Sequence, residues 1–300
     1  MDANATLAVR RFNRTVAQRV GALGDHYLSR DRPLGAARVL WEIGSQGCEV
    51  RVLRTRLGLD SGYLSRLLRS LERAGLVSVA PDPVDQRVRR AVLTARGLDE
   101  WALLDERSDE LARSMVQQLP ATQQQRLVSA MATVTTLLTA AAVQLEVADP
   151  RQPAAEHCLA QYFAELDRRF PVGFDPAAAL ATDRDWMRPP HGLLVVAELD
   201  GEPVGCGALK LHPGGLAEVK RVWVSPATRG LGLGRRLLAD LELRALQHGA
   251  QRTRLDSNAS LTEAIALYRS AGYAEVAPFN AEPYADFWFE KRLRGEDPTS

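Results

Sequence analysis

The segment that most constrains the fold of this chain is a glycine-rich turn between a strand pattern and a helix pattern. Glu218–Val224 alternates as a strand does, and the apolar residues that follow have helical spacing: Leu233, Leu237, Leu238 and Leu241. Between the two patterns lies Arg229–Gly234. Glycines let the backbone approach a ligand closely, and the N–H groups at a helix start attract anions. The segment therefore predicts a strand-turn-helix unit that binds a pyrophosphate.

The glycine spacing narrows the kind of ligand. A dinucleotide fingerprint reads Gly-x-Gly-x-x-Gly and follows the first strand of its domain. Here Gly230, Gly232 and Gly234 alternate with leucines, Arg229 opens the turn, and three expected strands precede it. Arg-x-x-Gly-x-Gly is the pattern of the GNAT acetyltransferase superfamily, which this segment resembles.

A second stretch, Asn258–Tyr273, resembles another GNAT signature. It predicts a helix over Ser260–Ala271 that begins with a capping box of Ser260 and Glu263 and is followed by Gly272. The ending Phe287–Leu293 resembles the last strand of the family. The resemblance covers residues 143–293 and implies an α+β fold with a mixed, mostly antiparallel central sheet.

The resemblance also implies acetyl-CoA as the acyl donor and assigns residues to it. The strand before the turn is expected to splay from its neighbour, so that its backbone can bind the pantetheine arm. Tyr268 matches the family's general acid, which protonates the departing thiolate; the other interpretation is a half-buried structural tyrosine. The expected cofactor-binding residues are Val222, Trp223, Val224, Arg229, Gly230, Leu231, Gly232, Leu233, Gly234, Arg235, Asn258 and Tyr268.

A substrate ammonium must lose a proton before it attacks a thioester, and Glu218 is the candidate base. It lies eleven residues before Arg229, where several GNAT enzymes carry a catalytic glutamate. Two other roles stay open: a surface strand residue paired with Lys220 or Arg221, and a counter-charge for the ammonium. No serine or cysteine has the partners of an activated nucleophile, so we expect direct transfer.

The first half of the chain reads as helical and carries the positive charge. Residues 51–90 contain nine arginines against four acidic residues, in a chain whose net charge is +1. Val50–Leu57 and Ser61–Ala74 are helix patterns joined by a short turn, which is helix-turn-helix spacing. Leucines mark the inner face of the second helix, and the opposite face predicts contacts with double-stranded DNA. The candidates there are Ser61, Gly62, Tyr63, Ser65, Arg66 and Arg69.

A hairpin pattern over Leu76–Leu93 follows, and Arg87 and Arg89 near its tip suit a narrow minor groove. Together with Asp60–Val77 and Leu93–Gly97, the hairpin resembles the MarR family of winged-helix regulators. That family implies a mainly α fold and a homodimer built from the first and last helices, here expected at Ala5–Leu28 and within Ala95–Ala141. The alternative is an arginine-rich, solvated helix in a module kept only for dimerisation.

Composition limits the remaining choices. A chain of 300 residues with 46% hydrophobic residues can bury two cores, and we expect domains at 1–141 and 142–300. Three scattered cysteines support neither a disulfide framework nor a metal site. No apolar run has the length of a membrane span and no signal peptide is recognisable, so the sequence predicts a cytoplasmic protein without membrane contact.

These observations predict an acetyl-CoA-dependent N-acetyltransferase that acts on a small primary amine and is fused to a DNA-binding regulator module. The alternative is a MarR-type regulator whose GNAT half senses a metabolite or acetyl-CoA. Arg168, Arg169 and Arg184 could recognise an anionic group on the acceptor.

Overall fold

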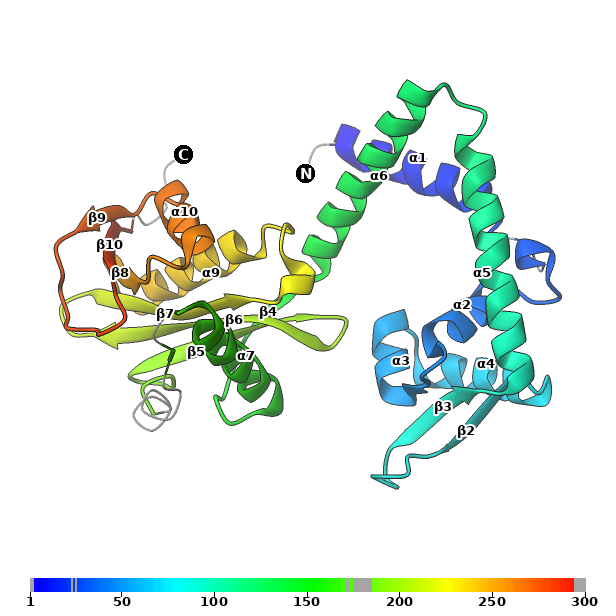
Figure 1. The fold of residues 1–300 in the computed structure, drawn as a ribbon, viewed down its shortest axis with the longest axis horizontal. Helices are drawn as coiled ribbons and strands as arrows, with labels where there is room; N and C mark the ends of the chain where they lie inside the picture. Colours follow the sequence, from blue (N-terminus) through cyan, green and yellow to red (C-terminus); the bar gives the residue numbers. More distant parts are fainter. Residues whose placement is uncertain (1–2, 23, 25, 171–172, 175–184, 294–300) are drawn as a thin grey trace. The chain divides into compact units, whose positions relative to one another are not determined.

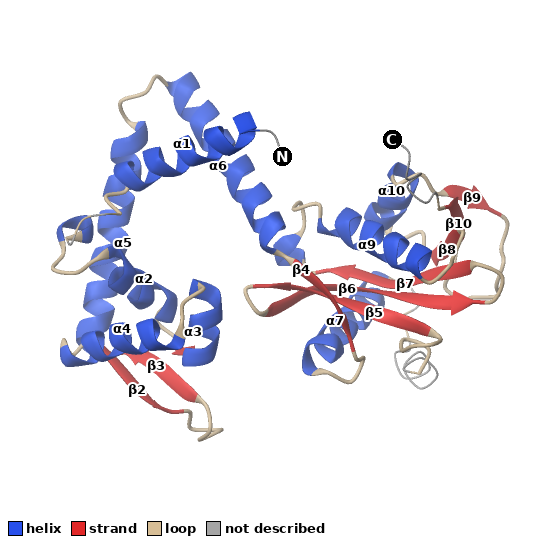
Figure 2. Ribbon diagram, turned by 180° about the vertical axis from the view of Figure 1, so that it is seen from behind, coloured by secondary structure: helices blue, strands red, loops and turns tan. Residues whose placement is uncertain are grey.

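The computed structural model describes residues 3–22, 24, 26–170, 173–174 and 185–293 of the chain (Figure 1). The chain divides into two compact units, Met1–Ala132 and Thr133–Ser300. The division falls inside the helix Ala121–Ala142, at whose end the sequence-based boundary was expected. The first unit is mainly helical, and the second is built on a large sheet (Figure 2).

The first unit combines helices with a small three-stranded sheet of order β1-β3-β2. Its elements are α1 (Ala3–Arg19), the 3-10 helix η1 (Tyr27–Ser29), α2 (Leu34–Ile43), β1 (Cys48–Glu49), α3 (Val50–Leu57), α4 (Ser61–Arg73), β2 (Val77–Pro81), β3 (Arg89–Leu93), α5 (Ala95–Val116) and the start of α6 (Ala121–Ala142). Gly58 ends α3 in a left-handed conformation, and the side chain of Asp60 caps α4 by accepting from the Tyr63 N–H at 2.8 Å. The predicted helix-turn-helix and hairpin are confirmed.

The core of this unit lies between α2, α3, α4 and the sheet. The predicted inner face of α4 is buried, and it packs with Val39, Leu40 and Leu53. One close contact joins the hairpin to α5. Thr94 caps α5 through the Gly97 N–H at 3.0 Å, and its hydroxyl donates to the Gly75 carbonyl at 2.7 Å. A Cβ atom on Gly97 would lie 2.0 Å from the Leu76 carbonyl oxygen, so only glycine fits there.

The second unit is a seven-stranded sheet with helices on both faces (Figure 1). Its further elements are β4 (Gln144–Ala148), α7 (Pro153–Arg169), β5 (Gly192–Leu199), β6 (Glu202–His212), β7 (Leu216–Val224), the 3-10 helix η2 (Pro226–Thr228), α9 (Leu233–Gln247), β8 (Arg252–Ser257), α10 (Thr262–Ser270), β9 (Ala274–Val276) and β10 (Phe287–Arg292). The strand order is β4-β5-β6-β7-β8-β10-β9. Among the described strands of this sheet, only β7 and β8 pair in parallel, across the α9 connection, so the predicted mixed, mostly antiparallel sheet is confirmed.

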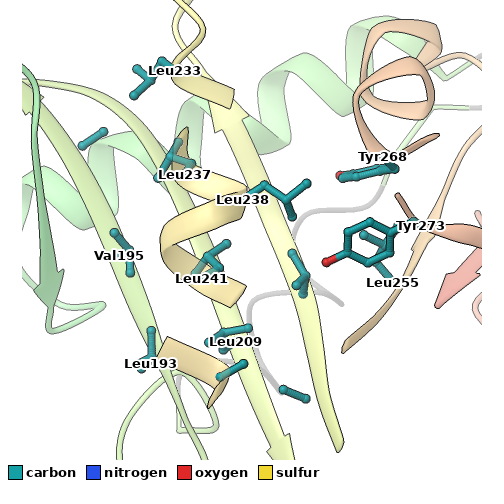
Figure 3. Close-up of a cluster of buried hydrophobic side chains, with 14 of the residues drawn as sticks. Leu193, Val195, Leu209, Leu233, Leu237, Leu238, Leu241, Leu255, Tyr268 and Tyr273 are labelled. Atoms are coloured by element: carbon teal, nitrogen blue, oxygen red, sulfur yellow. The ribbon is translucent and has the colours of Figure 1, made fainter. Parts of the chain in front are cut away.

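Alternation along the strands divides the second unit into two cores. Val195 and Leu209 face α9, where Leu237 and Leu241 are fully buried. Their neighbours Leu194 and Val196 face α7 on the other side of the sheet. Figure 3 shows the first of these cores, with Tyr268 and Tyr273 beside the leucines of α9.

Two expectations from the sequence are wrong in detail. The first helix ends at Arg19, well before Leu28, because a turn and η1 follow it. The capping box of Ser260 and Glu263 does not form: α10 begins after Leu261 without a side-chain cap. The Glu263 carboxylate binds Arg169 instead, since a bidentate guanidinium contact is stronger than a neutral capping bond.

No helix among the described residues combines the length and the apolar character that crossing a bilayer requires.

Replacing Gly97 by alanine should destabilise the first unit by about 1–3 kcal/mol, because the added methyl group overlaps a backbone carbonyl that cannot move independently of the hairpin. Urea unfolding followed by circular dichroism measures this. Glu106→Ala, an exposed change on the same helix, is the control and should shift the midpoint little. Equal effects of the two variants would contradict the close contact.

Candidate active site

The candidate site begins where β7 and β8 separate. The two strands pair at only three positions, of which Glu218–Arg254 is the last, and beyond it they are no longer paired with each other. Arg221 has a positive φ of 57°, and the register between β6 and β7 shifts beside it, so β7 bulges at this point. The Lys220 Nζ atom lies 2.7 Å from Asp256 Oδ1 and bridges the diverging strands. The predicted splay is therefore present.

A cavity of about 530 Å³ lies beside the end of β7, beyond its last pair with β8. Its walls come from α7, the end of β7, η2 with the glycine-rich turn, the start of α9, and α10. The lining residues are Tyr162, Glu165, Leu166, Arg169, Val222, Trp223, Val224, Thr228, Arg229, Gly230, Gly232, Leu233, Gly234, Arg235, Leu261, Glu263, Ala264 and Leu267. Because α7 and α10 cover opposite faces of the sheet, one cavity can reach both only where the strands have parted.

The glycine-rich turn has the shape that the sequence predicted. Gly230 and Gly232 have φ values of +83° and +72°, which side chains rarely tolerate, and Gly232 is the residue before α9. A Cβ atom on Gly234 would come within 3.3 Å of Leu267 in α10. The first turn of a helix leaves backbone N–H groups without intrahelical partners, and here they adjoin the cavity. A phosphate group fits this environment.

Most of the predicted cofactor-binding residues line the cavity. Those that do not are Leu231, Asn258 and Tyr268. Asn258 instead organises the loop before β10: its Nδ2 donates to the Tyr284 carbonyl at 2.8 Å, and its Oδ1 accepts from the Ser260 N–H. Its side chain therefore fixes the region after β8.

Tyr268 lies in the core beneath the cavity wall. Its side chain is 7% exposed and packs against the rings of Tyr273 and Phe289. Burial raises the pKa of its hydroxyl above the ordinary value, so the group carries its proton throughout the physiological range. Figure 3 shows the hydroxyl directed toward the leucines of α9. Among the described residues, none hydrogen-bonds this hydroxyl.

Glu218 lies at the start of the opening and does not line the cavity. Its carboxylate is buried and lies 3.0 Å from both His212 Nε2 and Lys220 Nζ, and 3.3 Å from Arg254. Burial alone would raise the pKa of Glu218, but the charges of Lys220 and Arg254 and the hydrogen bonds lower it overall. Glu218 is thus paired with Lys220, as one interpretation of the sequence held. The pair lies in the interior, however, where that interpretation had expected a surface position.

Three charged residues line the cavity although the sequence assigned them no place in the cofactor site: Glu165, Arg169 and Glu263. Arg169 had been considered for an anionic acceptor, but it binds both glutamates. A signal for Glu165 existed, because it interrupts the apolar stripe of α7 one residue before the buried Leu166. Arg168 is exposed, and Arg184 lies outside the described residues.

The predicted DNA-contacting residues lie together on the first unit. On α4, Ser61, Gly62, Tyr63, Arg66 and Arg69 are exposed and Ser65 is half-buried. The Arg66 guanidinium lies 5.7 Å from the centre of the Tyr63 ring. Arg87 and Arg89 are exposed on the hairpin, and the Arg87 N–H donates to the Asp85 side chain. Helix and hairpin therefore present arginines to the solvent, as the winged-helix interpretation requires.

Comparison with known proteins identifies both halves. The sequence profile of the acetyltransferase (GNAT) family matches residues 159–273, and that of the MarR family matches residues 31–88. An IAA acetyltransferase of Azospirillum brasilense is 34% identical over 135 residues, which are 45% of this chain and 87% of that protein. The N-alpha-acetyltransferase RimI of Mycobacterium tuberculosis is 38% identical over 122 residues, or 39% of this chain and 73% of that protein.

Among solved structures, a putative acyl-CoA N-acyltransferase of Klebsiella pneumoniae is similar to this chain with 29% identity and a TM-score of 0.41. The match covers 51% of this chain and 98% of that one. Within the described residues, no group of three or more histidine, cysteine or acidic side chains is arranged to hold a metal ion.

Glu218→Gln should destabilise the second unit by roughly 1–3 kcal/mol at neutral pH, because the cations around the buried carboxylate lose their counter-charge. Since folding lowers the pKa of Glu218, its contribution is present above the ordinary glutamate pKa and is lost as the pH falls through the lowered value. The difference from the wild type should therefore shrink below about pH 4. Urea unfolding at several pH values measures it, and a difference independent of pH would refute the ion pairing.

Proposed function

The chain belongs to the GNAT acetyltransferase family and carries a MarR-family domain in its first half, and from this premise we propose that it transfers an acetyl group from acetyl-CoA directly to a small primary amine while its first unit binds double-stranded DNA. The observation that carries the enzymatic part is the cavity beside the end of β7, where this strand is no longer paired with β8. It is lined by the bulged strand and by the glycine-rich turn at the start of α9.

The cavity fits acetyl-CoA for two reasons. The N–H groups at the start of α9 and the positive end of its helix dipole suit the pyrophosphate. The backbone of Val222–Val224 lines the same cavity and is not paired with β8, so it is available to the amide groups of a pantetheine arm. Acetyl-CoA is thus the proposed donor, bound with its nucleotide end at the turn.

Tyr268 is the proposed acid for the leaving thiolate. Burial raises its pKa, so the hydroxyl is protonated when the thiolate forms, although the same shift makes it a weaker acid. It reaches toward the sheet from α10, whose Ala264 and Leu267 line the cavity. The amine is proposed to attack the thioester directly. Cys158 and Cys206 are buried in the core between α7 and the sheet, so neither is placed to accept the acetyl group first.

For Glu218 we propose the electrostatic role among those left open by the sequence. A carboxylate that contacts Lys220, Arg254 and His212 and whose pKa is lowered is a weak proton acceptor. Its negative charge is balanced by Lys220 and Arg254, so its proposed role is to hold these side chains where the strands part.

The DNA-binding part of the proposal rests on the arginines of α4 and of the hairpin. A homodimer belongs to the same proposal, because α1 and α6 carry apolar side chains that a second copy would cover. The exposed large ones on the described parts of these helices are Leu7, Val9, Phe12, Val16, Val128, Met131, Leu137 and Leu138.

Tyr268→Phe should lower kcat about a hundredfold, because the thiolate then leaves without a proton from the enzyme. Thiol release from acetyl-CoA, measured with a panel of primary amines, tests both the activity and the variant. Tyr273→Phe is the matched control: Tyr273 is a buried tyrosine of the same core, whose hydroxyl pairs with Thr253.

Loss of the Tyr273 hydroxyl should leave kcat within about twofold. Binding of acetyl-CoA without turnover of any amine would favour the sensing regulator over the enzyme. Equal activities of Tyr268→Phe and the wild type would remove Tyr268 as the acid.

Arg66→Ala should weaken binding to promoter DNA and reduce the slope of log affinity against log salt by about one, if the guanidinium contacts a phosphate. A gel-shift assay at several salt concentrations measures this. Arg113→Ala, which removes the same charge from an exposed site on α5, is the control. Wild-type binding that does not depend on salt would contradict the proposed phosphate contacts.

A further inference from the structure

The carboxylate of Glu165 is the meeting point of several side chains at the cavity. Glu165 lies on α7 and is 9% exposed. The Trp223 Nε1 atom donates to its Oε2 at 2.9 Å, and the Arg229 guanidinium lies 2.7 Å and 2.6 Å from its two oxygens. Arg169 Nε lies 3.1 Å from Oε1. One buried acid therefore ties α7 to the end of β7 and to the first residue of the glycine-rich turn.

The same network continues across the cavity to α10. Arg169 donates from NH1 and NH2 to the two oxygens of Glu263, at 2.8 Å and 3.2 Å. This contact lowers the pKa of Glu263 to about 2. Glu263, Arg169, Glu165 and Arg229 thus form a chain of alternating charges, and all four line the cavity.

A buried carboxylate beside a phosphate site would repel the phosphate unless its negative charge were neutralised. Here both Glu165 oxygens are occupied by N–H donors, so the charge is neutralised locally and the donors are held in fixed places. Arg229 is the residue from which the turn departs. Fixing its side chain on α7 fixes the position from which Gly230 and Gly232 follow.

We propose that Glu165 is a positioning residue for acyl-CoA: it holds Arg229 and Trp223 so that the glycine-rich turn and the end of β7 keep the shape that the nucleotide binds. The inference rests on the proposed function, because it takes acyl-CoA as the occupant of the cavity. It changes the role expected for Arg229, which anchors the turn by its side chain instead of binding the pyrophosphate. The phosphates are then bound mainly by backbone N–H groups, which do not depend on side-chain rotamers.

The test is Glu165→Gln, which keeps the shape of the side chain and removes its charge. The KM for acetyl-CoA should rise about tenfold, while kcat at saturating acetyl-CoA stays within about twofold. With acetyl-pantetheine, which lacks the pyrophosphate and so makes no use of the glycine-rich turn, the fall in kcat/KM should be much smaller than with acetyl-CoA. A purely structural role would affect both donors alike, so this comparison separates positioning from general destabilisation.

Asp167→Asn is the matched control. It removes a carboxylate two residues away on the same helix, from an exposed side chain that does not line the cavity. Its KM for acetyl-CoA should equal that of the wild type. A rise as large as that of Glu165→Gln would overturn the proposal.

Arg229→Gln removes the charge of the other partner in the same contact. Because Arg229 is half-exposed, this variant keeps the proposal testable if Glu165→Gln folds poorly. If the two residues act as one unit, the double variant should bind CoA no worse than either single variant. Additive losses would mean that Arg229 binds the phosphates by itself, which would overturn the proposal.

Calorimetric titration of the wild type with CoA separates this inference from the function on which it rests. No binding to the wild type would overturn the proposed function. Tight binding to the wild type and equally tight binding to a folded Glu165→Gln would leave that function intact and overturn the role of Glu165.

Discussion

The separation of β7 from β8 is the constraint on which the second unit depends. Strands in a sheet hold each other by regular backbone hydrogen bonds, and here that pairing stops at Glu218–Arg254. At this point charged side chains connect the two strands in place of backbone hydrogen bonds, because Lys220 binds both Glu218 and Asp256 across the gap. The unpaired backbone that results is exposed inside a cavity where a ligand with amide groups can replace the missing partner.

Two buried carboxylates hold this opening from different sides. Glu218 binds Lys220 and Arg254 where the strands part. Glu165 binds Arg229 and Trp223 where β7 passes into the glycine-rich turn. Each is costly to bury unless its oxygens are satisfied, and in each case several donors surround it. Along β7, the bulge at Arg221 lies between Glu218 and Trp223, the residue that donates to Glu165. The shape of the strand is thus fixed at both ends by side chains from neighbouring elements.

Most of the fold could be predicted from local patterns. The leucine stripe of α4, the turn at Gly58 and the cap at Asp60 each specify a structure within a few residues, and all three are present. The glycines of the second unit behave in the same way, because a positive φ at Gly230 and Gly232 is a local requirement. Local prediction is wrong at Glu263, where a long-range contact competes with the predicted cap. The Glu263 carboxylate binds Arg169, 94 residues earlier in the chain, and does not cap α10.

The sequence by itself determined the two families of fold, the strand-turn-helix cradle and the arginine-rich face of the helix-turn-helix, because each rests on spacings within one segment. Only the tertiary structure decided how the charged residues pair. Glu165 and Arg229 are 64 residues apart, and nothing in either segment indicates that one neutralises the other. The burial of Tyr268 and the pairing of Glu218 were decided in the same way. The environment of an ionisable group, and hence its pKa, depends on side chains that meet only after folding.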